Sequence, residues 1–339
     1  DSGGAIVNHG SALVKSSSFA NNSSGDSTGG ILNVSTFDDL GVLYVATVTV
    51  TDCDFRANAS SDSGGGIGNE GGNVLVSNCT FREMETGDSG GAISNTALDD
   101  VPGILNISNC VFSDNSAGDN GAGIVNESTA FITDVVFVRN VAGGNGGSIV
   151  CENGETTIAN VLFEDNHAMS GGAIFVAGGV VNIANTTVRD NTVIEAGGGI
   201  LVEGGTVVIE NSFISENAFG LSGGGVSNSG GILTLANVTI RDNSSGEDGG
   251  GLVNTNAGIV IVEEMLIIAD NSASRSGGGV VNNDASITLS PNTVIEKNIV
   301  GELGGGLYNV GNATATLNSA QITNNSPDNI VNDGGIIIP

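Results

Sequence analysis

The chain has 339 residues, with 55 Gly, 4 Pro and no Trp. The glycines follow no three-residue period, which excludes collagen, and a net charge of −29 opposes binding to nucleic-acid phosphate or to anionic membranes. No apolar run approaches the ~18 residues of a membrane helix, so we expect no nucleic-acid partner and no direct membrane insertion.

The first recurring pattern along the chain is Gly-Gly-x-Ile-x-Asn. It begins at Gly3–Asn8 and returns at Gly64–Asn69 and Gly90–Asn95, and with Val or Leu in place of Ile at Gly223–Asn228, Gly249–Asn254, Gly277–Asn282 and Gly304–Asn309. Glycine pairs supply the close backbone approach and positive φ that sharp turns require. We therefore interpret each copy as a turn followed by a short strand.

The second pattern is an apolar residue, two variable residues and Asn. Copies lie at Phe55–Asn58, Phe112–Asn115, Phe137–Asn140, Phe163–Asn166, Val188–Asn191, Ile214–Asn217, Ile240–Asn243, Ile268–Asn271 and Ile295–Asn298. The residues before each copy alternate between apolar and variable, as in Val207-x-Ile209, which is strand periodicity.

A further Asn stands three residues before the apolar residue of the second pattern. We interpret it as a corner whose amide turns inward and bonds its equivalents in the neighbouring coils, as in an asparagine ladder. The positions are Asn78, Asn109, Asn160, Asn185, Asn211, Asn237 and Asn292.

The spacing of the repeat decides the fold prediction. Variants of the first pattern begin at Gly121, Gly146, Gly171 and Gly197. From Ile124 through Ile149, Ile174, Ile200 and Val226 to Leu252, the equivalent apolar residues lie 25 or 26 residues apart. Such a period indicates stacked supersecondary units that share one continuous core. We predict an all-β, right-handed parallel β-helix (solenoid) of about twelve coils, forming a single domain over residues 1–339. Asp1 lies two residues before one motif and the chain stops shortly after another, so we expect a fragment of a longer secreted protein.

The motifs Gly90–Ile93 and Phe112–Asn115, together with Gly171–Ile174, are similar to the repeat of the polymorphic outer-membrane-protein family. Stretches such as Gly223–Asn243 also resemble the repeats of large secreted β-helix proteins. The first resemblance implies a bacterial surface adhesin of the autotransporter type. It therefore implies an extracellular or cell-surface location.

Two insertions interrupt the repeat after Gly29 and Gly90. The first carries Phe37, Asp38, Asp39, Leu40 and Tyr44, and the second carries Leu98, Asp99, Asp100, Val101 and Pro102. Both follow the same motif, so we expect them on one side, two coils apart. Two neighbouring acidic and apolar loops could bind a cation or a partner, because loops often carry the function of solenoids, or they could be independent surface insertions.

Acidic residues recur two positions after the apolar residue of the second pattern. They form an expected outward column of Glu83, Asp114, Asp165, Asp190, Glu216, Asp242 and Asp270. Like charges one coil apart repel, and nearby Arg or bound Ca²⁺ would relieve that repulsion. The calcium candidates are Asp38, Asp39, Asp99, Asp100, Asp165, Asp190, Glu216 and Asp242; the alternative is a solvated acidic face.

Cys53, Cys79 and Cys110 occupy equivalent positions in three successive coils. We expect one inward column with a spacing of ~4.8 Å, which is compatible either with one disulfide or with three buried thiols. Twelve Asn-x-Ser/Thr sequons occur, and the candidates free to carry glycan are Asn21, Asn106, Asn312 and Asn324.

No catalytic residues are predicted. Only two histidines exist, and the basic residues are scattered singly along the chain. The alternative is a polysaccharide-acting, pectate-lyase-like β-helix enzyme, for which Arg189 and Arg241 are the best available bases. An ice-binding face is a minor alternative, because Thr47-x-Thr49-x-Thr51 is not repeated in each coil.

The leading hypothesis is a non-enzymatic extracellular or cell-surface segment, either structural or adhesive. It would act as a stiff rod or as a filament building block. The expected partners are further protein chains stacked end to end, or glycans of the cell surface or matrix.

Overall fold

The computed structural model describes residues 4–218 and 220–339. Asp1, and Gly3 at the start of the first motif, lie outside the described residues. Every regular element in the described part is a β-strand. The chain divides into two compact units, residues 1–167 and 168–339, and each is considered separately. The single-domain prediction therefore stays a prediction.

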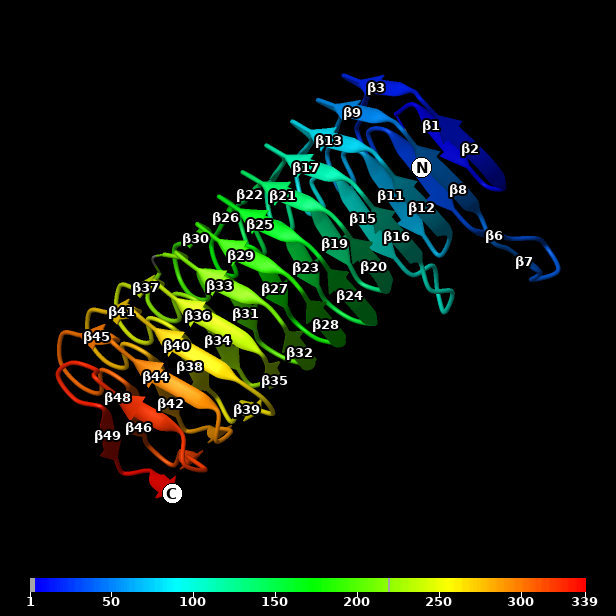
Figure 1. Ribbon diagram of the computed structural model, residues 1–339. Coiled ribbons are helices and arrows are strands. Elements are labelled where there is room, and N and C mark those ends of the chain that lie inside the picture. Colours follow the sequence, from blue (N-terminus) through cyan, green and yellow to red (C-terminus); the bar gives the residue numbers. More distant parts are fainter. Residues whose placement is uncertain (1–3, 219) are drawn as a thin grey trace. The chain divides into compact units, whose positions relative to one another are not determined.

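In the first unit the chain passes six times through three main strand positions, which build three parallel sheets (Figure 1). Sheet 1 contains β1 (Ile6–Asn8), β5 (Ile31–Val34), β11 (Ile67–Glu70), β15 (Ile93–Thr96), β19 (Ile124–Asn126) and β23 (Ile149–Cys151). Sheet 2 contains β2 (Ser11–Lys15), β8 (Thr47–Thr51), β12 (Asn73–Ser77), β16 (Ile104–Ser108), β20 (Thr129–Thr133) and β24 (Glu155–Ala159). Sheet 3 contains β3 (Ser18–Ala20), β9 (Asp54–Arg56), β13 (Thr80–Arg82), β17 (Val111–Ser113), β21 (Val136–Val138) and β25 (Leu162–Glu164).

The second unit repeats this arrangement with seven coils. Sheet 1 contains β27 (Ile174–Val176), β31 (Ile200–Val202), β34 (Val226–Ser229), β38 (Leu252–Thr255), β42 (Val280–Asn283), β46 (Leu307–Val310) and β49 (Ile330–Asp333). Sheet 2 contains β28 (Val180–Ala184), β32 (Thr206–Glu210), β35 (Ile232–Ala236), β39 (Ile259–Val262), β43 (Ser286–Thr288), β47 (Thr314–Thr316) and β50 (Ile336–Ile338). Sheet 3 contains β29 (Thr187–Arg189), β33 (Phe213–Ser215), β36 (Val238–Arg241), β40 (Leu266–Ala269), β44 (Thr293–Glu296) and β48 (Gln321–Thr323).

Alternation of side chains explains why these segments are strands. In β12, Val74 and Val76 are buried while Leu75 between them is 43% exposed. The register places Val74 beside Leu105 and Val76 beside Ile107 of the next coil. Inward residues thus stack on inward residues in every coil, which is the only pairing that buries one face of each strand. The predicted all-β parallel solenoid is confirmed, with about thirteen turns rather than twelve.

Two columns of buried asparagine cross the interior. One comes from the Gly-Gly-x-Ile-x-Asn motif, where Nδ2 of Asn69 donates to Oδ1 of Asn95 at 2.7 Å. The other comes from the second pattern, where Nδ2 of Asn217 donates to Oδ1 of Asn243 at 3.0 Å. Each amide also donates to a main-chain carbonyl, as Asn217 does to Val188 at 3.0 Å. Asparagine ladders therefore exist at these two positions of the coil, and they satisfy buried polar groups at the coil turns.

The corner asparagines that the sequence placed in a ladder point outward instead. Asn78 and Asn109 have φ values of 53°, and both side chains are exposed. The left-handed conformation of this corner turns Cβ away from the core, and asparagine tolerates that conformation better than most residues. The inward-ladder interpretation was therefore wrong for all of the positions named: Asn78, Asn109, Asn160, Asn185, Asn211, Asn237 and Asn292 are exposed or half-buried.

Candidate binding face and projecting hairpin

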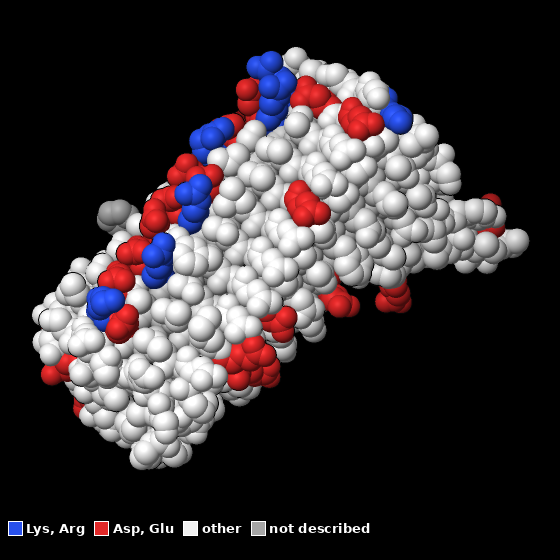
Figure 2. Space-filling model, in the orientation of Figure 1, with Lys and Arg blue, Asp and Glu red and all other residues white. Residues whose placement is uncertain are grey.

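The outward side of sheet 2 in the first unit carries very little charge. Its six strands present three outward columns, and Lys15 and Glu155 are the charged residues among those eighteen positions. The middle column runs in register through Leu13, Thr49, Leu75, Asn106, Phe131 and Thr157. Figure 2 shows this broad face with few charged atoms, beside an edge on which basic and acidic side chains alternate. A protein with a net charge of −29 thus has a face without strong electrostatic repulsion.

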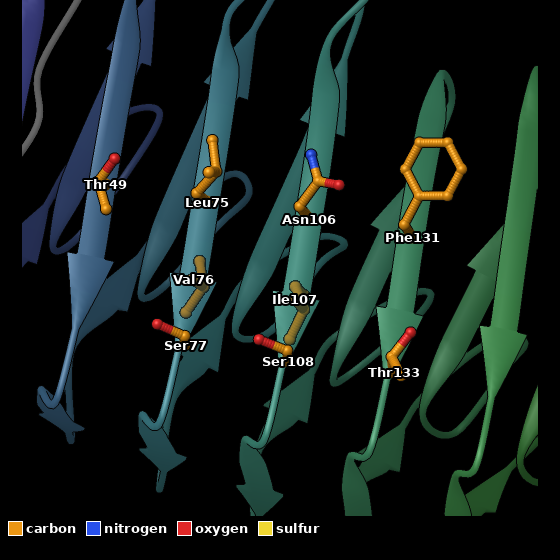
Figure 3. Close-up of a pocket in the computed structure, with 9 residues that line it drawn as sticks. All are labelled: Thr49, Leu75, Val76, Ser77, Asn106, Ile107, Ser108, Phe131 and Thr133. Carbon is orange, nitrogen blue, oxygen red and sulfur yellow. The ribbon is translucent and has the colours of Figure 1, made fainter.

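A shallow groove of about 360 Å³ lies on this face. Leu75 and Phe131 are 43% and 40% exposed, whereas Val76 and Ile107 are buried beneath them. Figure 3 shows the middle column crossing four strands, with a second line of hydroxyl groups alongside it. The lining residues are Thr49, Leu75, Val76, Ser77, Asn106, Ile107, Ser108, Phe131 and Thr133.

Sequence reasoning missed this groove. The available signal was Phe131, an aromatic residue at an outward position between Ala130 and Ile132, both of which are buried. The sequence does not show which outward residues of distant coils become neighbours, because that depends on the register between strands.

The first insertion is a short antiparallel hairpin of β6 (Thr36–Phe37) and β7 (Leu43–Tyr44), which projects from the stacked strands (Figure 1). Its tip exposes Leu40 (88%) beside Asp39, and Tyr44 at the base of the hairpin is 54% exposed. The Asp38 carboxylate closes the loop, because its Oδ1 accepts hydrogen bonds from the backbone N–H groups of Leu40 (2.9 Å) and Val42 (2.8 Å). The hairpin is therefore pre-ordered and still presents apolar side chains to water.

The second insertion is a tighter turn in which Leu98 and Val101 exchange backbone hydrogen bonds of 3.0 and 2.9 Å. It connects β15 to β16, as the hairpin connects β5 to β8, so both insertions leave between sheet 1 and sheet 2. The prediction that they emerge on one side is confirmed by this topology.

The calcium candidates are not gathered into one place. Within the residues that the structure describes, no group of three or more His, Cys, Asp or Glu side chains forms a metal site. Asp38 is engaged inside its own loop, and Asp99 has a φ of 51° in the second turn, beside the exposed Asp100. Asp39 is exposed beside Leu40. Calcium binding stays a prediction.

The acidic column has a backbone explanation that sequence reasoning did not find. Asp165, Asp190, Glu216 and Asp242 have φ values between 55° and 58°, and Arg139 occupies the same position with a φ of 54°. Aspartate, like asparagine, is favoured in the left-handed region. Conformation therefore favours Asp at this corner whether or not it binds a cation.

Arginine relieves part of the acidic charge, as expected. Nε and Nη2 of Arg139 contact the two carboxylate oxygens of Asp114 at 2.7 and 2.8 Å. This hydrogen bonding lowers the pKa of Asp114. A hydrogen bond from the Thr80 hydroxyl and the nearby Arg82 likewise lower the pKa of Asp54. In the second unit Arg189 and Arg241, the bases considered for lyase chemistry, contact Asp190 at 3.6 Å and Asp242 at 3.4 Å.

Cys53, Cys79 and Cys110 form the expected inward column, with exposures of 4%, 1% and 1%. The backbone N–H of Cys53 donates to Sγ of Cys79, and that of Cys79 to Sγ of Cys110, each at 3.4 Å. All four cysteines of the chain carry free thiols in this structure. Burial raises the pKa of Cys53, and it raises that of Cys151 to about 12. Disulfide pairing within the column stays a prediction.

The four glycosylation candidates differ in accessibility. Asn21, Asn312 and Asn324 are exposed, whereas Asn106 is half-buried in the groove of sheet 2. Nδ2 of Asn312 donates to Oδ1 of Asp284 at 3.1 Å, and a glycan attached there would leave one N–H on Nδ2.

Comparison with known proteins adds one finding. Residues 160–177 match the Chlamydia polymorphic membrane protein (Chlamydia_PMP) repeat. No curated protein and no solved structure matches the chain. In the described residues no helix has the length and apolar character needed to cross a membrane. The matched segment contains Phe163, Asn166 and the Gly171–Ile174 motif.

Proposed function

We propose that this chain is a non-enzymatic, structural and adhesive segment of an extracellular or cell-surface protein. The solenoid fold suits a rod-like structural role, and the matched repeat supports a surface location. Parallel strand pairing and the asparagine ladders join each coil to its neighbours. Such a stack resists bending and holds its outward columns at fixed spacing.

The observation that carries the adhesive part is the outward side of sheet 2 in the first unit, on which Lys15 and Glu155 are the charged residues. The net charge of −29 opposes association with an acidic partner elsewhere on the chain. A face with exposed Leu13, Leu75 and Phe131 offers apolar contact area with little of that cost. The projecting hairpin, with exposed Leu40 and Tyr44, adds a second pre-ordered contact.

Adhesion is tested with beads that carry the purified chain, added to cultured cells and to extracellular matrix. We expect bound beads that free chain displaces. Leu13→Asp places a charge on the sheet 2 face and should reduce binding. Val111→Asp is the matched control, because Val111 is a 38% exposed apolar residue on sheet 3. Equal loss in both variants, or no binding by the unmodified chain, would contradict the proposal.

End-to-end stacking into filaments, and calcium binding by the acidic residues, are further parts of this proposal. Negative-stain electron microscopy across a concentration series, with calcium and with chelator, tests both. Filaments that lengthen with concentration would support stacking, and their loss in chelator would support a role for calcium. Single particles at every concentration would contradict filament formation and leave adhesion as the proposed function.

A further inference from the structure

We propose that the groove on sheet 2 of the first unit binds an uncharged, extended glycan, with one pyranose ring packed on the exposed face of Phe131. This inference rests on the proposed adhesive function and names the chemistry of the ligand. Three properties of the groove support it: an exposed aromatic ring, polar side chains without protein partners, and no charge.

Phe131 differs from the stacked phenylalanines of sheet 3 in this unit. Phe55, Phe81, Phe112 and Phe137 are fully buried in one stack, whereas Phe131 is 40% exposed on a strand whose inward neighbours complete the core. An exposed aromatic ring gains free energy when an apolar surface covers it. One face of a pyranose ring is lined by C–H groups and can lie flat on such a ring, while its hydroxyls point outward.

The polar groups around Phe131 suit sugar hydroxyls. Asn106 stands directly beside Phe131 in the strand register, and Ser108 stands beside Thr133. In the described part of the chain, none of the side chains of Thr49, Asn106, Ser108 and Thr133 has a protein hydrogen bond. Hydroxyl and amide groups both donate and accept, as sugar hydroxyls do. The groove therefore offers partners that water now satisfies and that a glycan could replace.

Charge decides which glycans fit. None of the nine lining residues is charged, and the chain as a whole is strongly acidic. Glycans with uronate, sialate or sulfate groups would be repelled and would find no cationic partner in the groove. A neutral glycan meets no such cost.

The spacing of the coils determines which shape of ligand fits the groove. Leu75, Asn106 and Phe131 occupy one column in successive coils, about 4.8 Å apart as parallel strands are. The face is flat and the groove crosses several strands (Figure 3). An extended glycan lying across the strands would place successive sugars over successive residues of this column. A single sugar would contact only one of these residues.

We assign this sugar to a glycan of a partner surface. A sugar attached to Asn106, which begins the sequon Asn106–Ser108, is the alternative that the test separates. Phe131 lies beside Asn106 in either case, so both sources share the same contact. Expression with and without N-glycosylation separates them.

The test titrates unglycosylated chain with chitohexaose, cellohexaose and mannohexaose, and with hexagalacturonate as the anionic control, by calorimetry. We expect at least one neutral oligosaccharide to bind and hexagalacturonate not to bind. Phe131→Ala should weaken binding about tenfold or more, which corresponds to ~1.4 kcal/mol. Phe131→Tyr should retain it, which also shows that the fold is intact. Val111→Ala, on sheet 3, is the matched control.

If no free oligosaccharide binds, the same chain from a glycosylating host is examined by NMR for contacts between an Asn106-linked sugar and Phe131. Such contacts, if Asn106→Gln removes them, would overturn the assignment to a partner glycan and replace it with an attached sugar. Absence of both free binding and these contacts overturns the inference, as does equal affinity in the parent and Phe131→Ala. Bead adhesion that persists in Phe131→Ala would leave the adhesive function standing without this groove. Oligosaccharide binding by a chain that adheres neither to cells nor to matrix would support glycan binding in the groove and contradict the adhesive function.

Discussion

The two units fill one equivalent interior column in different ways. In the first unit it consists of Phe19, Phe55, Phe81, Phe112, Phe137 and Phe163. In the second it consists of Val188, Ile214, Ile240, Ile268, Ile295 and Ile322. The rings stack with centroids 4.7–5.0 Å apart and interplanar angles of 5–18°. That separation equals the strand spacing, so the backbone repeat itself imposes the stacking. The column requires apolar volume, and either an aromatic or a β-branched residue supplies it.

The asparagine ladders also differ between the two units. The ladder of the second pattern is unbroken in the second unit, whereas Met84 replaces one asparagine in the first. The ladder of the first pattern meets Cys151 in the first unit, where Asn126 donates to the Thr156 hydroxyl at 2.8 Å instead. In the second unit Val202 precedes Asn228, and Oδ1 of Asn228 has no partner among the described residues. At the Cys151 interruption a nearby hydroxyl takes over the hydrogen bond, whereas at the Val202 interruption the amide oxygen is left without a partner in the described part of the chain.

The largest effect is expected in the phenylalanine stack. Phe112→Ala removes a fully buried ring between Phe81 and Phe137, and we expect a loss of about 3–5 kcal/mol in the free energy of unfolding. Phe112→Ile, which introduces the residue type of the second unit, should lose clearly less. Urea unfolding with hydrogen exchange on the flanking strands measures both, because long repeats need not unfold in one step. Equal losses in the two variants would show that aromaticity itself is required.

A smaller loss in the free energy of unfolding is expected from substitutions in the unbroken asparagine ladder of the second unit. Asn243 receives hydrogen bonds on Oδ1 from the N–H and Nδ2 of Asn217, and it donates to Asn271 and Ile214. Asn243→Ala leaves several buried groups unpaired, at about 1–3 kcal/mol for each group that water cannot reach. Asn243→Met copies the natural interruption at Met84 and should cost less than alanine because it fills the volume. Hydrogen exchange of the Asn217 amide is the direct measurement, and unchanged protection in Asn243→Ala would contradict this account.

A substitution at the interrupted ladder of the second unit should increase the stability of the fold. A Cβ built on Gly231 would lie 2.6 Å from Cγ1 of Val202 and 3.1 Å from Oδ1 of Asn228, so those two atoms face the same space. Val202→Thr keeps the shape and places a hydroxyl where it can donate to that oxygen. We expect no loss and a gain of up to about 1 kcal/mol, measured as the urea midpoint. Val207→Thr is the control, because it buries a hydroxyl in a fully buried position and should destabilise.

The smallest effect concerns the ion pair of Arg139 and Asp114. The pKa of Asp114 is lowered in the folded chain, so its contribution to stability is complete above the ordinary Asp pKa of about 3.9. That contribution is lost as the pH falls through the lowered value. Both side chains are about half exposed, so it should stay below ~1 kcal/mol. Carboxyl NMR should show Asp114 titrating at higher pH in Arg139→Gln, whereas Arg56→Gln should leave it unchanged.

Much of the fold is predictable from sequence because each coil repeats the same physical requirements. Alternating apolar residues, glycine pairs and a period of 25 or 26 residues predicted a parallel solenoid, and they placed Cys53, Cys79 and Cys110 in one buried column. The two insertions follow equivalent motifs, so their common side was also predictable. Little of the binding face was predictable, because the groove joins outward residues of four strands.

Which residues recur and which strand faces are apolar can be read from the amino-acid sequence, because alternation and period are local properties of the chain. Which asparagines point inward depends on the folded coil. Asn69 and Asn217 enter ladders, whereas Asn78 turns outward because its corner adopts a left-handed conformation that spacing alone does not reveal. The structure also decided that Phe131 lies beside Asn106, because the register between coils depends on packing the inward columns of both strands at once.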